Sequence, residues 1–361
     1  MTAEKPIKLD DFVAPPGIQL GQRIGLDTEF VRERTFWPQL ALLQIRINGE
    51  TFLLDPLQGE PSESLLRCVI DAAPTLMHAP GEDLVCLKHR FGWLPGALFD
   101  MQLAAAYVGL GVGLGYQALV SLVLAEHVDK GETRSDWLQR PLSDAQLRYA
   151  ASDVLHLEAL HDALRPQLQE RGHLDWFEDD CARMLERAAQ NPVDLHPHLQ
   201  FRPAMGLDRV AQARIRRCLI WREAMAEQRD RPRSWMLDNE AVTALAHADL
   251  SSAGSVAQVL ARRGRAIRQA ERELEPLLQA PLNEIEETMP LAPKPDQDLK
   301  NQVGRMQQAV ADFAERTGLP KEILLARRHL ESYALTGEWP SDKAGWRQDE
   351  LERALAAVRD S

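Results

Sequence analysis

The sequence predicts an α/β domain with a mixed sheet flanked by helices, followed by two small all-α domains. Two observations predict the α/β domain. Three strand-like segments follow one another within residues 23–56, and short apolar strands then alternate with helical segments up to about residue 190. A meander followed by βα units is typical of a mixed sheet with helices on its faces. Beyond residue 208 the pattern is helical throughout, which predicts the all-α part.

The meander consists of three predicted strands, residues 23–30, 39–47 and 51–56. Each is a short apolar segment bounded by polar or turn-forming residues. The second and third are separated by Asn48–Gly49, a dipeptide that favours the two-residue turn of a β-hairpin. We therefore expect these segments to begin the sheet.

Alternating elements follow the meander. We expect strands at 75–79 and 97–102, with a helix at 81–91 between them. The glycine-rich stretch 109–115, GLGVGLG, invites comparison with a dinucleotide-binding loop. It lacks the G-x-G-x-x-G spacing and follows a helical pattern instead of a strand, so we interpret it as a flexible turn.

One long helix is predicted over residues 143–172. Ser143 and Gln146 have the spacing of a capping box, which marks the beginning of a helix. Pro166 is expected to kink the helix near its end, and Gly172 to stop it.

The predicted domain limits are residues 1–190 for the α/β domain, 208–282 for the first helical domain and 296–361 for the second. The stretches 191–207 and 281–295 contain several prolines and interrupt the helical pattern, which is typical of linkers.

The composition favours a globular protein of the cytoplasm. Of 361 residues, 45% are hydrophobic and 27% charged, which are globular values. No apolar run is long enough to span a membrane, and the first residues lack the apolar core of a secretory signal. The four cysteines are scattered, which argues against a zinc site or a disulfide framework. We expect no membrane partner, and no segment stands out as one that forms an oligomer.

The net charge of −12 at first argues against a nucleic-acid partner. The charge is unevenly distributed, because residues 209–273 contain 13 Arg and 8 Asp or Glu. A carboxylate-rich metal site would also add negative charge that its cations neutralise. The total charge is therefore a poor guide to the partner.

Asp27 and Glu29 lie two positions apart in an apolar strand, so both side chains point to the same face. The strand rise places them about 7 Å apart. Burial of two unpaired charges would cost several kcal/mol each. Salt bridges to Arg32 or Arg34 are one explanation, and a site for cations is the other.

Two further acids favour the cation site. Asp83 follows the strand at 75–79, in the first turn of the next helix, and Asp153 lies within the helix 143–172. Tyr149 precedes Asp153 by four residues, so the two share a helix face. Each acid alone is unremarkable, but together they could converge at one edge of a sheet. Carboxylate oxygens prefer Mg²⁺ or Mn²⁺, and four carboxylates can hold two such cations.

These segments resemble the motifs of the ribonuclease D family, in the DEDDy branch of the DEDD superfamily of 3′–5′ exonucleases. LDTEF (26–30), HAPGEDL (78–84) and YAASD (149–153) are similar to the three exonuclease motifs, and DKGETRSDWLQRPL (129–142) to a segment that marks this family. The helical blocks resemble helicase and ribonuclease D C-terminal (HRDC) domains. The resemblance implies a ribonuclease H-like exonuclease domain followed by two HRDC-type domains.

The resemblance also implies the roles of the site residues. Asp27, Glu29 and Asp153 would bind the cation that activates water. Asp83 would hold a second cation, bridged through Asp27, and Tyr149 would orient the water. Two divalent cations, Mg²⁺ or Mn²⁺, are thus the implied cofactors.

Four further residues are candidates for contacts with substrate: His78, Lys130, Arg217 and Arg263. A histidine at the end of a core strand is as often structural. The two arginines belong to Arg-rich helical segments, for which a solvated face is the alternative to binding of the phosphate backbone.

The function implied by the resemblance is metal-dependent 3′–5′ exoribonuclease activity that releases nucleoside 5′-monophosphates. The implied partner is RNA with a single-stranded 3′ end, such as a tRNA precursor or another small structured RNA. A general or DNA-directed 3′–5′ exonuclease is one alternative. A non-catalytic RNA-binding adaptor is another, although such an adaptor would be expected to have lost some of the five motif residues.

Overall fold

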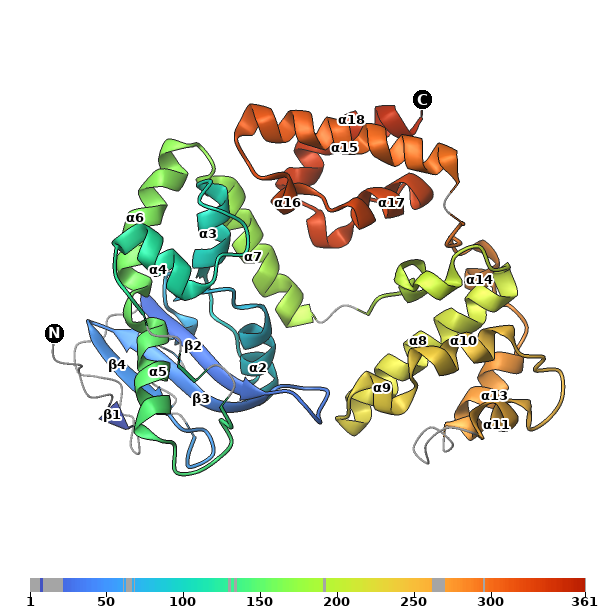
Figure 1. Cartoon of the computed structure of the whole chain (residues 1–361), viewed down its shortest axis with the longest axis horizontal. Coiled ribbons are helices and arrows are strands. Elements are labelled where there is room, and N and C mark those ends of the chain that lie inside the picture. The colour runs from blue at the N-terminus through green and yellow to red at the C-terminus, as the bar shows by residue number, and fades with distance from the viewer. Residues whose placement is uncertain are drawn as a thin grey trace. The chain divides into compact units, whose positions relative to one another are not determined.

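The computed structural model describes residues 7–8, 22–60, 62, 67, 69–128, 131–132, 135–190, 193–261, 270–294 and 296–360. The chain divides into two compact units, whose elements are labelled in Figure 1. Unit 1 comprises Met1–Arg32, Pro38–Asn191 and Phe313–Leu324, and unit 2 comprises Glu33–Trp37, Pro192–Asp312 and Leu325–Ser361.

Unit 1 contains a six-stranded sheet with the order β1-β4-β3-β2-β5-β6. The strands are β1 (Ile7–Lys8), β2 (Ile24–Val31), β3 (Gln39–Ile47), β4 (Glu50–Leu54), β5 (Thr75–Met77) and β6 (Leu98–Asp100). β3 is antiparallel to β2 and to β4, whereas β2, β5 and β6 are parallel to one another. The predicted mixed sheet is confirmed.

The hairpin between β3 and β4 turns at Asn48 and Gly49, which have positive φ values of 52° and 80°. Positive φ at both central residues is the requirement of the turn that favours Asn-Gly, so this prediction is confirmed. The register of β2 against β3 pairs Asp27 with Gln44 and Glu29 with Leu42, and then shifts between Glu29 and Phe30.

Helices cover both faces of the sheet (Figure 1). They are α2 (Gly81–Phe91), α3 (Met101–Tyr107), α4 (Tyr116–Leu124), α5 (Asp144–Leu155), α6 (Leu157–Glu170) and α7 (Leu174–Gln190). Thr28 hydrogen-bonds to α2, whereas Gly25 lies against Leu157 of α6. Side chains of a strand alternate between faces, so α2 and α6 cover opposite faces of β2.

The prediction of a single helix over 143–172 is wrong. The helix is broken at His156, which separates α5 from α6, while Pro166 lies inside α6. The capping box of Ser143 and Gln146 is present at the beginning of α5. Gly172 follows α6 with a φ of 71°, as expected of a residue that stops a helix.

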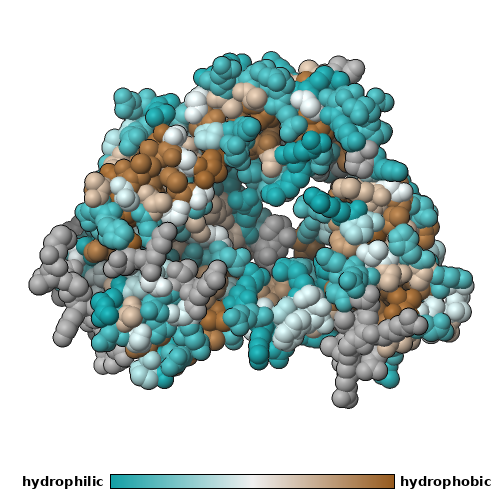
Figure 2. Space-filling view, in the orientation of Figure 1, coloured by the Kyte–Doolittle hydropathy of each residue, from teal (hydrophilic) through white to brown (hydrophobic). Residues whose placement is uncertain are grey.

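The glycine-rich stretch 109–115 connects α3 to α4 and therefore follows a helix, as expected. Val112 in this stretch and Leu122 in α4 are exposed. Figure 2 shows a hydrophobic area on the surface of unit 1. A hydrophobic turn after a helix is unlike a phosphate-binding loop, which supports its interpretation as a turn.

Unit 2 is built from helices, which confirms the predicted class of the C-terminal part. They are η1 (Pro197–Gln200), η2 (Arg202–Ala204), α8 (Arg209–Arg229), α9 (Arg233–Met236), α10 (Asn239–His247), α11 (Ser255–Leu260), α13 (Glu271–Gln279), α14 (Glu284–Thr288), α15 (Gln297–Thr317), α17 (Arg327–Thr336), η3 (Ser341–Lys343) and α18 (Trp346–Arg359). The end of α15 and α16 (Lys321–Leu324) belong to unit 1. The domain limits at 190, 208–282 and 296–361 stay a prediction.

The core of unit 2 includes a segment from early in the chain. Phe36 is only 5% exposed among the buried residues of α8, α10 and α13. The Asp230 carboxylate, directly after α8, accepts hydrogen bonds from the backbone N–H groups of Phe36 and Trp37, at 2.9 and 3.0 Å. The segment Glu33–Trp37 is thus an integral part of this core. Among the described residues, no helix has the length and hydrophobicity that a membrane crossing requires.

Candidate active site

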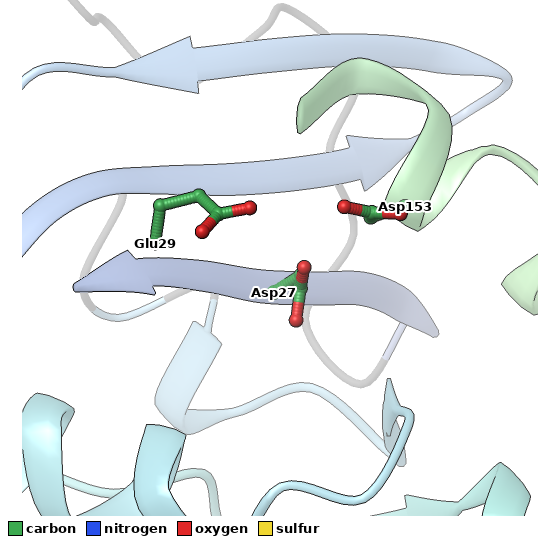
Figure 3. Close-up of side chains that lie close together, drawn as sticks. All are labelled: Asp27, Glu29 and Asp153. Carbon is green, nitrogen blue, oxygen red and sulfur yellow. The ribbon is translucent and has the colours of Figure 1, made fainter. Parts of the chain in front are cut away.

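Three carboxylates meet on one face of the sheet (Figure 3). Asp27 and Glu29 come from β2, and Asp153 comes from α5. One oxygen from each lies within 4.8 Å of the others. The strand alternation accounts for the first pair, and α5 reaches them because it packs across β2, β3 and β4. The structure therefore brings together three of the four acids that the sequence singled out.

Asp83 lies apart from this cluster, in the first turn of α2. Its side chain is buried, at 7% exposure, and accepts a hydrogen bond from the hydroxyl of Thr28. Its charge nevertheless acts on Asp27 and Glu29, whose pKa values it raises. Asp83 is thus within electrostatic reach of the cluster but is held from the other face of β2.

The pKa values of the clustered carboxyl groups are raised, first by burial. Repulsion from neighbouring acids adds to the effect for Asp27 and Glu29, and the pKa of Glu29 rises to about 9. Burial raises the pKa of Asp153 to about 7, although a hydrogen bond from Tyr149 opposes the rise. A tenfold change in proton affinity is worth about 1.4 kcal/mol. Ionising all three groups therefore costs free energy unless positive charge lies among them.

No arginine is among the groups that shift the pKa values of Asp27 and Glu29 in the described part of the chain. Arg32 forms an ion pair with Glu82 of α2, at 2.5 Å. The charges that dominate the pKa of Glu29 are those of Asp153 and Asp83, and both are negative. The arrangement favours a cation site over a structural salt bridge.

The donor set fits a divalent, oxygen-preferring cation such as Mg²⁺ or Mn²⁺. Gln44 supports this fit. It lies opposite Asp27 on β3, so the two side chains share a face. Gln44 is fully buried, and neither polar atom of its amide has a hydrogen-bond partner among the described residues. Such burial is costly unless the amide is hydrogen-bonded, so Gln44 offers a donor and an acceptor to groups bound beside Asp27.

Tyr149 lies one turn before Asp153 on α5, as the spacing predicts. Its ring packs against Trp137, with the ring centroids 6.0 Å apart. Trp137 is almost fully buried beneath α5, in a cluster that includes Leu42 and Ala150. Trp137, in the segment before α5, therefore supports the helix that carries Tyr149 and Asp153.

Arg140 connects the segment around Trp137 to the sheet. Its guanidinium forms an ion pair with Asp55 and donates to the backbone oxygen of Trp137, at 2.7 Å. It also donates to the backbone oxygen of Ala41, at 2.6 Å. Ala41 is the extra residue at the register shift between β2 and β3, where a bulge disrupts the ladder. Arg140 satisfies a backbone group at that bulge.

Asp100 and Tyr116 lie near the motif residues although sequence analysis did not single them out. Asp100 accepts hydrogen bonds from the backbone N–H groups of Ala79 and Gln102, both at 2.9 Å. Ala79 has a φ of 54°, which is rare for an alanine, and it belongs to the turn that leads to Asp83. The position of Asp100 immediately before α3 was the only signal available in the sequence, and it indicates no more than a helix cap.

The four candidates for substrate contact differ in placement. His78 is partly buried, burial lowers its pKa to about 4, and its ring packs edge-on against Tyr116, with centroids 5.7 Å apart. Lys130 and Arg263 lie outside the described residues. Arg217 is buried, and its five N–H groups donate to Glu286 and to the backbone oxygens of Leu277, Ala280 and Pro281. This argues against a phosphate contact by Arg217.

Comparisons with known proteins identify the family of this chain. A family model described as 3′–5′ exonuclease matches residues 11–169. The chain is 42% identical over 331 residues to Ribonuclease D of Xanthomonas oryzae pv. oryzae, with 91% of each chain covered. It is 32% identical over 353 residues to Ribonuclease D of Pseudomonas paraeruginosa, covering 94% of this chain and 92% of that protein.

A solved structure extends the similarity to the helical part. The crystal structure of Escherichia coli RNase D matches with a TM-score of 0.77 and 28% sequence identity, covering 94% of this chain and 93% of that one. The match therefore spans both the exonuclease domain and the C-terminal helices. The chain belongs to the ribonuclease D family and is a hydrolytic exoribonuclease.

Proposed function

We propose that this exoribonuclease shortens RNA from its 3′ end by hydrolysis assisted by two divalent cations. Water adds to the phosphorus of the last phosphodiester, and the bond from phosphorus to the 3′ oxygen of the preceding nucleotide breaks. That oxygen takes up a proton. The products are a nucleoside 5′-monophosphate and an RNA one nucleotide shorter. The observation that carries the proposal is the meeting of Asp27, Glu29 and Asp153 within 4.8 Å.

The motif residues have different roles in this proposal. Asp27, Glu29 and Asp153 would hold one cation, and Asp83, whose charge acts on Asp27, would help to hold the other. Tyr149 orients the attacking water from its place on α5. The bound cations supply the positive charge that stabilises the attacking and the leaving oxygen. Gln44, whose buried amide has no partner among the described residues, would bond to water beside Asp27, because the amide can donate and accept.

The proposed substrates are tRNA precursors and other small structured RNAs with a single-stranded 3′ tail. The similar Escherichia coli protein is described as an exoribonuclease involved in structured RNA processing, which supports this class. His78, Lys130 and Arg263 remain candidates for contacts with RNA. We exclude Arg217 from this set because all five of its N–H groups are engaged within unit 2.

We place this activity in the cytoplasm and assign it to a monomer with two HRDC-type domains. The cysteines of the described part of the chain, Cys86, Cys181 and Cys218, are buried and form no disulfide, as suits a reducing compartment. The clustered carboxylates all come from one chain, so the site requires no second copy.

The test uses a 5′-labelled RNA hairpin with a short single-stranded 3′ tail. The protein is incubated with it in Mg²⁺, in Mn²⁺ and in EDTA, beside a DNA hairpin of the same sequence. Asp153→Asn is the site variant. Asp162→Asn is the matched control, because Asp162 is an exposed aspartate that pairs with Arg23 in the same unit. We expect stepwise shortening of the RNA by the native protein and by the control only, with loss in EDTA.

Each other outcome identifies a competing function. Equal shortening of the DNA would indicate a general 3′–5′ exonuclease. Binding of RNA without shortening would indicate an RNA-binding adaptor. Shortening by the Asp153→Asn variant at the native rate would contradict the assignment of the site.

A further inference from the structure

The hydroxyl of Tyr116, a residue of the helix α4, lies at the break between α5 and α6. Tyr116, the first residue of α4, donates its hydroxyl hydrogen to the backbone oxygen of Ser152, at 3.1 Å. The backbone N–H of His156 donates to the same hydroxyl oxygen, at 3.0 Å. One hydroxyl thus joins the two sides of the break.

The two backbone groups are those that an unbroken helix would pair. In an α-helix the N–H of residue 156 donates to the oxygen of residue 152. Here the hydroxyl of Tyr116 stands between the two groups and bonds to both, and the N–H of His156 also points to the backbone oxygen of Val154. Insertion of a side chain into the helical ladder is a recognised cause of a sharp bend. It accounts for the break of the helix at His156.

The break lies beside the last acid of the cluster. Asp153 directly follows Ser152, whose oxygen accepts the bond from Tyr116. The hydroxyl lies close enough to Asp153 and Asp27 for their charges to raise its pKa, in addition to burial. A change of geometry at the break is therefore transmitted to Asp153 through a single residue of backbone.

The surroundings hold Tyr116 in place. Its ring packs edge-on against His78, the first residue after β5. Leu119 and Val120, one turn further along α4, are fully buried. The ring is thus fixed on one side by His78 and on the other by the burial of α4, so its hydroxyl is held at the break.

We propose that Tyr116 is a positioning residue of the active site. Its hydroxyl keeps the helix open between Asp153 and His156, and so fixes the Asp153 carboxylate at the distance from Asp27 and Glu29 that a shared cation requires. The proposal rests on the assignment of Asp27, Glu29 and Asp153 as cation ligands. Without the hydroxyl, Ser152 and His156 either pair directly, which straightens the helix, or remain unsatisfied. Both changes move Asp153.

The test compares Tyr116→Phe with Tyr107→Phe. Tyr107 is the matched control because it is a buried tyrosine of the same unit, whose hydroxyl bonds to Asp180 at 2.5 Å, in contact with α7. Three quantities are measured: the Kd of Mn²⁺ by calorimetry without RNA, the thermal midpoint in EDTA, and kcat and KM for a tailed RNA. Both variants lose one buried hydroxyl, so both are expected to lower the midpoint by a few degrees.

Only Tyr116→Phe is expected to weaken the binding of Mn²⁺, on the order of tenfold, as substitutions behind a metal ligand do. Its kcat falls at fixed Mn²⁺ and recovers in part at high Mn²⁺, while KM is unchanged. An unchanged Kd in Tyr116→Phe, or an equal rise in Tyr107→Phe, would overturn the proposal. So would a rise in KM alone, which would make Tyr116 a contact with RNA.

The same experiment separates this proposal from the one on which it rests. The native protein and Asp153→Asn are titrated with Mn²⁺ under identical conditions. If the native protein binds no Mn²⁺, or if Asp153→Asn binds it equally well, the assignment of the cation site fails. If Asp153→Asn loses binding while Tyr116→Phe keeps it in full, only the positioning role fails.

Discussion

The hydroxyl of Thr28 donates a buried hydrogen bond to the carboxylate of Asp83, and so ties β2 to the first turn of α2. Thr28 stands between Asp27 and Glu29 in the strand but points to the opposite face. β2 therefore carries Asp27 and Glu29 on one face, while Thr28 on the opposite face binds the third motif acid, Asp83. The hydrogen bond lowers the pKa of Asp83, which burial raises to about 6.

Replacement of Thr28 by valine is expected to raise the pKa of Asp83 further, because it removes a hydrogen bond to the ionised form. A hydrogen bond to a charged group is worth about 1.5–3 kcal/mol, which corresponds to a rise of about one to two in pKa. We expect the acid limb of the kcat profile to move to higher pH. The measurement is kcat against pH at saturating Mg²⁺.

The control for this variant is Thr75→Val. Thr75 is also fully buried in a strand of the sheet, but its hydroxyl has no hydrogen-bond partner within the described part of the chain. Its replacement is expected to leave the pH profile unchanged and to leave stability equal or slightly higher. Identical pH profiles for Thr28→Val and native protein would contradict the role given to Thr28.

The stability of the metal-free protein is expected to fall as pH rises. The pKa values of Glu29, Asp83 and Asp153 are raised in the folded protein to about 9, 6 and 7. Between an ordinary carboxyl pKa near 4 and these values, the folded state binds more protons than the unfolded state. The stability that these groups contribute is therefore complete below about pH 4 and is lost as pH rises to about 9.

Cation binding reverses this trend, because it requires the ionised carboxylates. The rise in thermal midpoint caused by Mn²⁺ should be larger at pH 8 than at pH 6. The measurement is the midpoint across this range in EDTA and in Mn²⁺. A midpoint in EDTA that increases with pH, or an effect of Mn²⁺ that is independent of pH, would be inconsistent with the cluster described here.

Asp153→Asn is expected to stabilise the metal-free protein at pH 8, by about 1–3 kcal/mol, because Asp153, with a pKa of about 7, is ionised at that pH in a site that disfavours its charge. The order should invert in Mn²⁺, where the native protein gains stability from binding and the variant does not. Chemical denaturation with and without Mn²⁺ measures both differences. If the variant is less stable than the native protein in EDTA, the charge of Asp153 does not destabilise the metal-free fold.

Arg217→Met is expected to destabilise the helical unit by about 3–5 kcal/mol, because it leaves the carboxylate of Glu286, only 1% exposed, with Arg216 at 3.8 Å as its remaining ion-pair partner among the described residues. Arg327→Ala is the control, since the pair of Arg327 and Glu331 is exposed and worth at most about 0.5 kcal/mol. Thermal unfolding measures both.

The salt dependence of RNA binding should be the same for folded Arg217→Met and native protein. A shallower dependence would restore Arg217 as a phosphate contact.

Local patterns were sufficient to predict much of the site. The alternation of a strand places Asp27 and Glu29 on one face, and a four-residue spacing places Tyr149 and Asp153 on one side of a helix. The break at His156 could not be predicted from its neighbourhood, because its cause is a hydroxyl some forty residues earlier in the chain. The only local signal, Pro166, is accommodated within α6.

The arginines of α8 illustrate the same difficulty. Their clustering resembles a nucleic-acid surface, but Arg214 donates to the backbone oxygen of Ala248 and Arg216 to that of Leu195. The acceptors lie in segments far from α8 in the sequence. A charge pattern alone does not tell whether the charges are free for a partner or bond to backbone groups of the same unit.

The bulge at Ala41 has a consequence for the alternation of side chains where β2 pairs with β3. Side chains of a strand alternate with a period of two, so a one-residue change between two paired strands normally turns every later side chain to the wrong face. Here the extra residue is absorbed between Glu29 and Phe30, beyond the pairs of Asp27 with Gln44 and Glu29 with Leu42. The extra residue of β3 therefore changes the side-chain alternation only beyond Glu29. The pairing that places Asp27 and Glu29 on one face is left unchanged by it.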